Sequence, residues 1–239
     1  MKRPAACLRR CLLLACLALA ARVPAHAQTL QSVVQAHVQA MGGEEALRRL
    51  KTVQMEGTIR QYLVLSAAFE SVIVQGEGVS RSLSWNGVRY RIVATAQGGH
   101  RMEGDGKRKP LDPREVAGEL DAADLAGPFV DTEKKGISLQ WQGEKTLKGG
   151  IKTHVVEASR REREPVRYFI RSDNHLLARM ETRSFHTDKA RWQGQSIDYE
   201  DHRPVAGVQM PFRIRLGDEY TVTVKAYKVN EAVDPAAFQ

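Results

Sequence analysis

Cysteine is scarce in this chain of 239 residues, and all three cysteines lie within the first 27 residues. The remaining 212 residues therefore cannot form disulfides, thiolate metal sites or a cysteine nucleophile. No segment after residue 27 has the run of roughly 20 apolar residues that a membrane-spanning helix needs. A GxSxG elbow, a P-loop and an HExxH motif are also missing. We therefore expect no catalytic residues, no cofactor and no metal.

The first 27 residues have the pattern of a secretory signal peptide. An apolar stretch, Cys11 to Ala21, follows four basic residues: Lys2, Arg3, Arg9 and Arg10. Ala25-His26-Ala27 then places small residues where a signal peptidase reads them, so we expect cleavage before Gln28 and export to a bacterial periplasm. As an alternative, Leu13-Leu14-Ala15-Cys16 resembles a lipoprotein cleavage box. Only about four apolar residues would then precede it, fewer than the usual range of roughly 7–15.

The predicted signal peptide distorts the net charge. Removing its five basic residues from the 36 Lys and Arg of the chain leaves 31 against 28 Asp and Glu, a net charge of +3. A balance so close to neutral gives no electrostatic footprint for nucleic acid. The length of the exported part suits a single domain, residues 28–239, with a core large enough to fold without disulfides.

Two helical regions are predicted. Thr29 can cap the first, over about 28–50, which Gly42-Gly43 interrupts. The second, about 112–125, has Asp112 as its cap and Pro113 at its first position. Its apolar face is thin, and Gly118 weakens it by roughly 1 kcal/mol relative to Ala. We expect this second helix to be a movable cover.

Alternating apolar and polar residues predict strands through most of the remaining chain. Asn86-Gly87 is a strong hairpin signal between two such runs, and Gly217-Asp218 joins two more near the end. Residues 98–110 are polar and rich in glycine, which predicts a loop. Clean alternation with short turns indicates a mainly β (α+β) fold with an antiparallel sheet whose second face meets water.

Two polar features are candidates for chemistry. The residues between Asp198 and His202, which include Glu200 and Asp201, cluster at a predicted strand end. A solvated turn explains this cluster more simply than an acid/base or metal site. His37 lies on the apolar stripe of the first helix, where a histidine satisfied between helix and sheet is more common than a ligand.

Five segments, in order, resemble outer-membrane lipoprotein-sorting proteins of the LolA-like superfamily. They begin with QAMGGEEALRRLKTVQMEGTI, at Gln39–Ile59, and continue at Leu111–Asp131, Gly143–Ala158, Ile197–Ile214 and Val229–Phe238. The resemblance is to the uncharacterised branch of that superfamily more than to its lipoprotein carrier. It implies a strongly curved antiparallel half-barrel sheet with helices packed in its concave face. The apolar space between sheet and helices takes up acyl chains in that group.

The function that the resemblance implies is a periplasmic, non-catalytic carrier or binder of lipid or lipoprotein acyl chains. A membrane-associated donor or acceptor protein is a further partner. Burial of apolar groups, at about 0.8 kcal/mol per methylene, is enough to hold such a chain. One alternative is an envelope sensor or scaffold module that binds a protein partner through the same sheet. Another is an enzyme that uses the Asp198–His202 cluster.

The predicted lining of the concave face consists of apolar residues at alternating strand positions. A slip of one residue in a strand's register would move its whole set to the other face. The predicted lipid-binding residues are Met55, Ile59, Val72, Val74, Leu83, Trp85, Ile92, Leu139, Trp141 and Met180.

Overall fold

The structure is a computed structural model that describes residues 29–62 and 65–239. The predicted signal peptide and the alternative cleavage box at Cys16 lie outside the described residues. Thirteen strands form one sheet in the order β6-β5-β4-β3-β2-β1-β13-β12-β11-β10-β9-β8-β7. Every neighbouring pair is antiparallel. No described pair joins β6 to β7, so the sheet is open.

The strands of the first half are β1 Thr52–Gln61, β2 Leu65–Val74, β3 Gly78–Trp85, β4 Val88–Thr95, β5 Gly98–Met102 and β6 Arg108–Pro110. Those of the second half are β7 Ile137–Thr146, β8 Lys152–Arg160, β9 Val166–Arg171, β10 Leu177–His186, β11 Arg191–Val205, β12 Val208–Leu216 and β13 Tyr220–Val229. Strand β1 pairs with β13, so the first and last strands of the described residues meet at the centre of the sheet.

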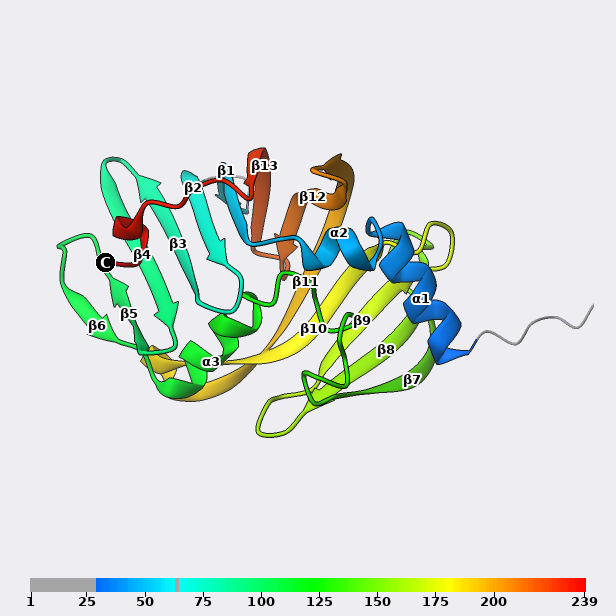
Figure 1. Ribbon diagram of the computed structural model, residues 1–239. Helices are drawn as coiled ribbons and strands as arrows, with labels where there is room; N and C mark the ends of the chain where they lie inside the picture. Colours follow the sequence, from blue (N-terminus) through cyan, green and yellow to red (C-terminus); the bar gives the residue numbers. More distant parts are fainter. Residues whose placement is uncertain (1–28, 63–64) are drawn as a thin grey trace, which may run out of the picture.

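The sheet curls into an open half barrel, as the resemblance implied, and the three α-helices lie on its inner side (Figure 1). Helix α1, Leu30–Ala40, packs Val33 against Val156 and Ile170. The short helix α2, Glu44–Arg48, adds Leu47 to a cluster with Val208. Together they cover one end of the concave face.

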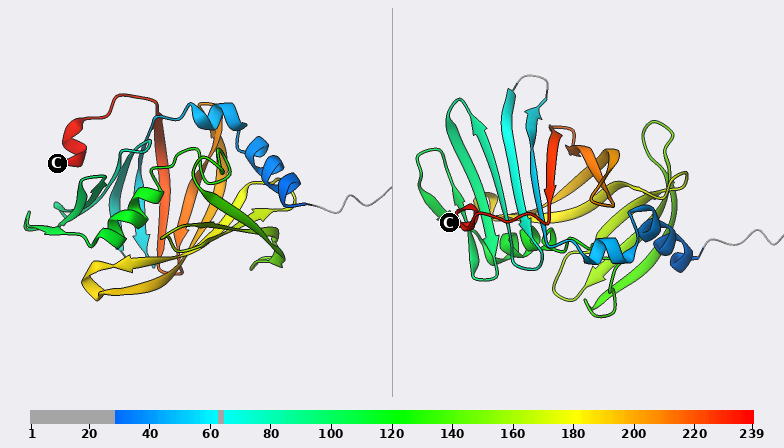
Figure 2. Two further views of the ribbon diagram at one scale, coloured as in Figure 1. Left: turned by 60° about the horizontal axis from the view of Figure 1, so that its bottom comes forward. Right: turned by 45° about the horizontal axis from the view of Figure 1, so that its top comes forward.

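Helix α3, Pro113–Asp121, lies inside the curve of the sheet (Figure 2). Asp112 caps it by accepting a hydrogen bond from the Arg114 amide at 2.9 Å, so the predicted start is confirmed. Val116 packs with Ala94 of β4 on one side. The β10–β11 hairpin, whose tip holds the 3-10 helix η1 (Thr187–Lys189), runs beneath α3 on the other side (Figure 1).

The C-terminal tail lies on the opposite, convex face. It ends in the 3-10 helix η2, Pro235–Phe238. A Cβ atom on Gly78 would lie 3.0 Å from the Phe238 ring, and Gln54 donates to the Ala232 carbonyl at 3.1 Å. Gly78 and Gln54 both alternate with residues that face the helices, so the tail and helices lie on different faces of the sheet.

The prediction of a loop over 98–110 is wrong. Residues Gly98–Met102 form β5, which pairs with β4, and Arg108–Pro110 form the edge strand β6. Edge strands commonly carry charge and proline because these discourage further pairing. That composition imitates a loop in the sequence.

Candidate functional site

The centre of the concave face is an apolar surface formed by five neighbouring strands. Ile59, Val222 and Val224 are buried at its base, and the other members remain partly exposed. No residue of α1, α2 or α3 belongs to this cluster, although all three helices lie on the same side of the sheet. We call it the apolar concave face; its members are Met55, Ile59, Ala67, Phe69, Leu83, Phe212, Ile214, Leu216, Tyr220, Val222, Val224 and Tyr227.

Four large hydrophobic side chains among the described residues are exposed at one end of this face. The β1–β2 and β3–β4 hairpins turn at this end (Figure 2). Their exposed fractions are 60% for Tyr62, 45% for Leu65, 44% for Trp85 and 43% for Tyr90. Tyr90 pairs with Leu83, a member of the apolar concave face. We call these four residues the rim, because they extend the apolar concave face out to solvent.

Eight of the ten predicted lining residues lie on the concave side of the sheet. Met55, Ile59 and Leu83 belong to the apolar concave face, and Trp85 belongs to the rim. Ile92 packs beneath α3. Met180 pairs with Tyr168 of β9 and Ile197 of β11.

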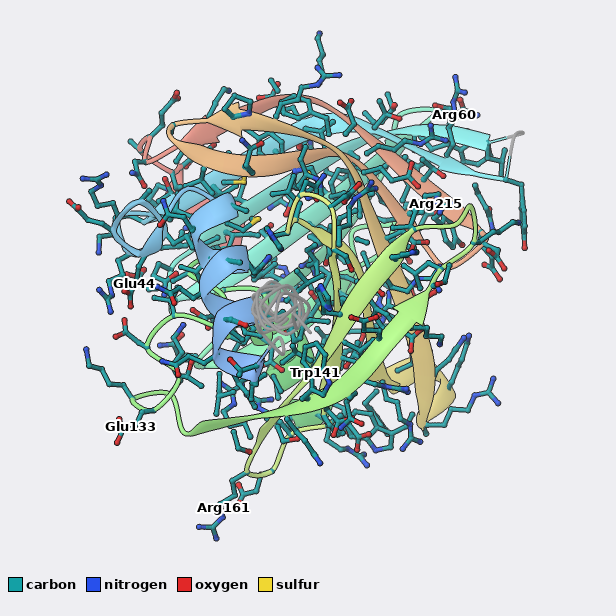
Figure 3. All side chains as sticks on the ribbon, turned by 90° about the vertical axis from the view of Figure 1, so that its right-hand side faces the viewer. Glu44, Arg60, Glu133, Trp141, Arg161 and Arg215 are labelled. Atoms are coloured by element: carbon teal, nitrogen blue, oxygen red, sulfur yellow. The ribbon has the colours of Figure 1, made fainter. Side chains whose placement is uncertain are left out.

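Leu139 and Trp141 lie at the other end of the concave side, under α1. Both pack against the cluster of Val33, Val156 and Ile170. Figure 3 shows Trp141 on β7, on the side where α1 runs. These two residues are therefore covered by a helix and do not adjoin the apolar concave face.

The face prediction is wrong for Val72 and Val74. Val72 pairs with Gln54 and Ser80, and both valines alternate with Ser71 and Ile73, so they point to the convex side. The sequence reads Ser71-Val72-Ile73-Val74, in which three consecutive apolar residues hide the alternation. Four further members were not predicted: Phe69, Phe212, Tyr220 and Tyr227. The alternation of apolar and polar residues in β12 and β13 was a signal for the last three.

A charged pair interrupts the apolar surface next to α3. Arg81 lies on the concave side of β3, two residues before Leu83, and its guanidinium donates to the carboxylate of Glu119 on α3. The side chains keep 33% and 21% of their exposure. Burial raises the pKa of Tyr199, from β11, to about 12, and the positive charge of Arg81 opposes that rise. The curled sheet therefore brings β3 and β11 near each other across the concave side.

Polar contacts hold α3 in place on three sides. Glu115 lies 2.9 Å from Arg101 of β5 and accepts a hydrogen bond from the Thr187 amide at 2.7 Å. Asp121, at the other end of α3, pairs with Arg160 of β8. The thin apolar stripe of α3 therefore understates how firmly this helix is held. Whether α3 moves as a cover stays a prediction.

Pockets lie on both sides of the sheet. One of about 80 Å³ lies on the concave side between the end of α3 and β7–β9, where it touches Tyr168. The other, of about 330 Å³, lies on the convex side between Leu147, Arg179 and Asp198. Small-molecule sites usually measure about 300–1,000 Å³. The pocket on the concave side is smaller than this range.

The prediction that the Asp198–His202 cluster ends a strand is wrong, because β11 continues to Val205. Asp198 is buried, and Arg179 (2.6 Å) and Arg215 (3.1 Å) both pair with it. Figure 3 shows Arg215 on the side of the sheet opposite α1. The cluster is thus mainly an ion-pair network on the convex face. Within residues 29–62 and 65–239 no group of three or more metal-ligating side chains is arranged to hold a metal.

His37 is satisfied between helix and sheet, as predicted. Its Nδ1 atom lies 2.8 Å from the carbonyl oxygen of His175, in the β9–β10 turn. Burial lowers the pKa of His37 to about 4, and the hydrogen bond to His175 only partly opposes this. The ring is therefore neutral near pH 7 and packs edge-on against Phe129.

Comparison with solved structures identifies the architecture. The LolA superfamily protein NE2245 from Nitrosomonas europaea superposes with a TM-score of 0.56 at 12% sequence identity, over 89% of this chain and 98% of that chain. The fold is LolA-like. No protein-family model and no curated protein matches the sequence. The LolA-like half barrel thus confirms the predicted fold class.

Two further solved structures superpose less well. A domain assigned to outer membrane lipoprotein sorting, from Vibrio parahaemolyticus, gives a TM-score of 0.49 at 6% identity, over 86% of this chain and 94% of that chain. The MucA/MucB complex of Pseudomonas aeruginosa gives a TM-score of 0.29 at 12% sequence identity, over 86% of this chain and 60% of that chain. No helix among the described residues is long and apolar enough to cross a membrane.

Proposed function

We propose that this protein is a non-catalytic binder or carrier of lipid or lipoprotein acyl chains in the bacterial periplasm. The observation that carries the proposal is the apolar concave face, a surface of twelve residues that no helix residue joins. Large exposed apolar surfaces on soluble domains commonly mark binding sites. The predicted signal peptide supports export, and the LolA-like fold agrees with the resemblance seen in the sequence.

The geometry suits a flexible apolar ligand better than a compact one. The apolar concave face extends from Tyr227 on β13 to the rim at Trp85. Each methylene removed from water on such a surface contributes about 0.8 kcal/mol. An acyl chain laid along the face needs few polar contacts.

The first experiment extracts lipids from protein purified from a native-like periplasm and identifies them by mass spectrometry. We expect to find acyl lipids in a constant molar ratio to the protein. Binding is then measured with a dansyl-labelled fatty acid and its methyl ester. Extraction without acyl lipid, together with no binding of either probe, overturns the proposal.

Strand β2 offers a matched pair of variants. Phe69→Asp places a carboxylate on the apolar concave face, whereas Val72→Asp places one on the convex side of the same strand. Burying an unpaired carboxylate against an acyl chain is costly, so Phe69→Asp should weaken binding by at least about tenfold. Val72→Asp should bind like the wild type, provided circular dichroism shows both variants folded.

The alternative of a module that binds a protein partner is favoured by one observation. Strand β7 is an edge of the sheet with ten residues, and its first half, Ile137–Trp141, carries no charge and no proline. An extended peptide could add to such an edge as a further strand. Capture of a protein partner that depends on β7, without acyl binding, would support this alternative over the first.

A further inference from the structure

The Arg81–Glu119 pair lies where the apolar concave face meets α3. On β3, Arg81 stands between Val79 and Leu83 on the concave side, and its cross-strand neighbours are Ser71 and Ile92. Leu83 belongs to the apolar concave face, while Ile92 packs beneath α3. A ligand chain lying on that face therefore reaches this pair at its inner end.

Arg81 has hydrogen-bond donors that no described residue accepts from. Its Nη1 atom bonds Glu119, and the described residues supply no partner for Nε or Nη2. Neither atom is among the fully buried polar atoms that lack a partner, although burial lowers the pKa of the Arg81 guanidinium. The side chain keeps 33% of its exposure although it lies on the inner side of a curled sheet. These donors are available to a ligand.

The charge of Arg81 is already balanced. Glu119 supplies one carboxylate, so a second carboxylate at the same guanidinium would stand close to a like charge. A neutral ester or amide carbonyl could instead accept from Nε or Nη2 without that repulsion. Tyr199 of β11 lies on the same concave side, paired with Ile214, and burial raises the pKa of its hydroxyl to about 12, so the hydroxyl is protonated near pH 7.

We propose that Arg81 and Glu119 form a neutral polar site that selects acyl chains with an uncharged ester or amide head group over free fatty acids. The inference rests on the proposed function and names the head-group class of the ligand. Arg81 provides the N–H donors, and Glu119 sets the selectivity by cancelling the charge of Arg81. The acyl chain extends from this site along the apolar concave face.

The test compares two ligands with one chain length, myristate and its glycerol monoester, by displacement of a dansyl-labelled methyl ester at pH 8. The wild type should prefer the monoester by about tenfold, the scale of one hydrogen bond to a charged group. Glu119→Gln keeps the size of the side chain but leaves Arg81 unbalanced, so it should reverse the preference toward myristate. Arg81→Met should bind the two ligands equally.

Glu115→Gln is the matched control. It weakens a different ion pair of the same helix, with Arg101, and changes neither Arg81 nor Glu119. It should keep the wild-type preference. The inference is overturned if Glu115→Gln reverses the preference as Glu119→Gln does, or if wild type and Glu119→Gln show the same ratio. In either case the proposed function stands as long as both ligands bind; if neither binds to the wild type, both proposals fall.

Discussion

The imidazole of His37 on α1 donates from Nδ1 to the carbonyl oxygen of His175, 2.8 Å away in the β9–β10 turn. This contact ties the first helix to the second half of the sheet, over residues 138 positions apart in the chain. The ring is buried, and burial disfavours its charged form, so the stability of this part of the fold is linked to pH.

We expect the stability of the protein to fall between pH 6.5 and 4. Burial lowers the pKa of His37 from 6.5 to about 4, so as pH falls the unfolded state takes up a proton before the folded state does. The lost free energy of unfolding is about 3 kcal/mol over that interval. Burial also lowers the pKa values of His154 and His202, which adds to the same trend.

Urea unfolding at several pH values measures this effect. His37→Gln should be less stable near pH 7 because it loses a fitted buried ring. Its stability should nevertheless fall less steeply below pH 6.5 than that of the wild type. An unchanged slope in the variant would assign the pH dependence to other groups.

A second prediction concerns the polar contacts of α3. Glu115 keeps 8% of its side-chain exposure and Arg101 keeps 18%, so the pair is largely shielded from water. Removing one partner of a buried ion pair costs about 3–5 kcal/mol of stability. Here the cost is reduced, because Arg101 still pairs with Asp188 after Glu115 is lost. Glu115→Gln should therefore lose about 2–4 kcal/mol.

The control for this prediction is Glu45→Gln on α2. Glu45 pairs with Arg49 at 2.9 Å, but both side chains are highly exposed, so the loss should stay under about 0.5 kcal/mol. Chemical denaturation gives both numbers. Similar losses in the two variants would show that the α3 contacts are no stronger than a surface ion pair.

Two glycine substitutions should act in opposite directions. Gly118 lies within α3 and a Cβ atom there meets nothing within 4 Å, so Gly118→Ala should stabilise the protein by about 0.5–1 kcal/mol. In Gly57→Ala the new Cβ would lie 2.2 Å from the carbonyl oxygen of Thr223 on β13. This clash should destabilise the protein by about 1–3 kcal/mol or more. Thermal unfolding distinguishes the two, and a stable Gly57→Ala would contradict the close pairing of β1 and β13.

Features set by neighbouring residues could be predicted from the sequence. Thr29 and Asp112 cap their helices by accepting hydrogen bonds from amides two or three residues ahead, and such contacts are written in the local sequence. The Asn86-Gly87 hairpin and the alternation of β7 are local in the same sense. The LolA-like arrangement itself followed from the resemblance of five segments.

Features set by distant residues could not be predicted. The side that Val72 faces depends on its pairing with Gln54 and Ser80, since the apolar run around it has no alternation. Arg81 and Glu119 are 38 positions apart and meet only because the sheet curls around α3. An arginine on a strand usually lies on the face that meets water, so the ion pair on the concave side had no signal in the sequence.

The last prediction concerns Trp85 at the rim. Its ring is 44% exposed, and on β3 it stands two residues beyond Leu83 on the concave side. An acyl chain on the apolar concave face should cover part of this ring, so Trp85→Ser should weaken acyl binding by about five- to tenfold. In a variant that also carries Trp141→Phe and Trp192→Phe, Trp85 is the remaining source of tryptophan fluorescence. Its emission should move to shorter wavelength as an unlabelled fatty acid methyl ester is added. Full affinity in Trp85→Ser together with unchanged emission would mean that the ligand does not reach the rim, and that the chain lies deeper, toward α1 and Trp141.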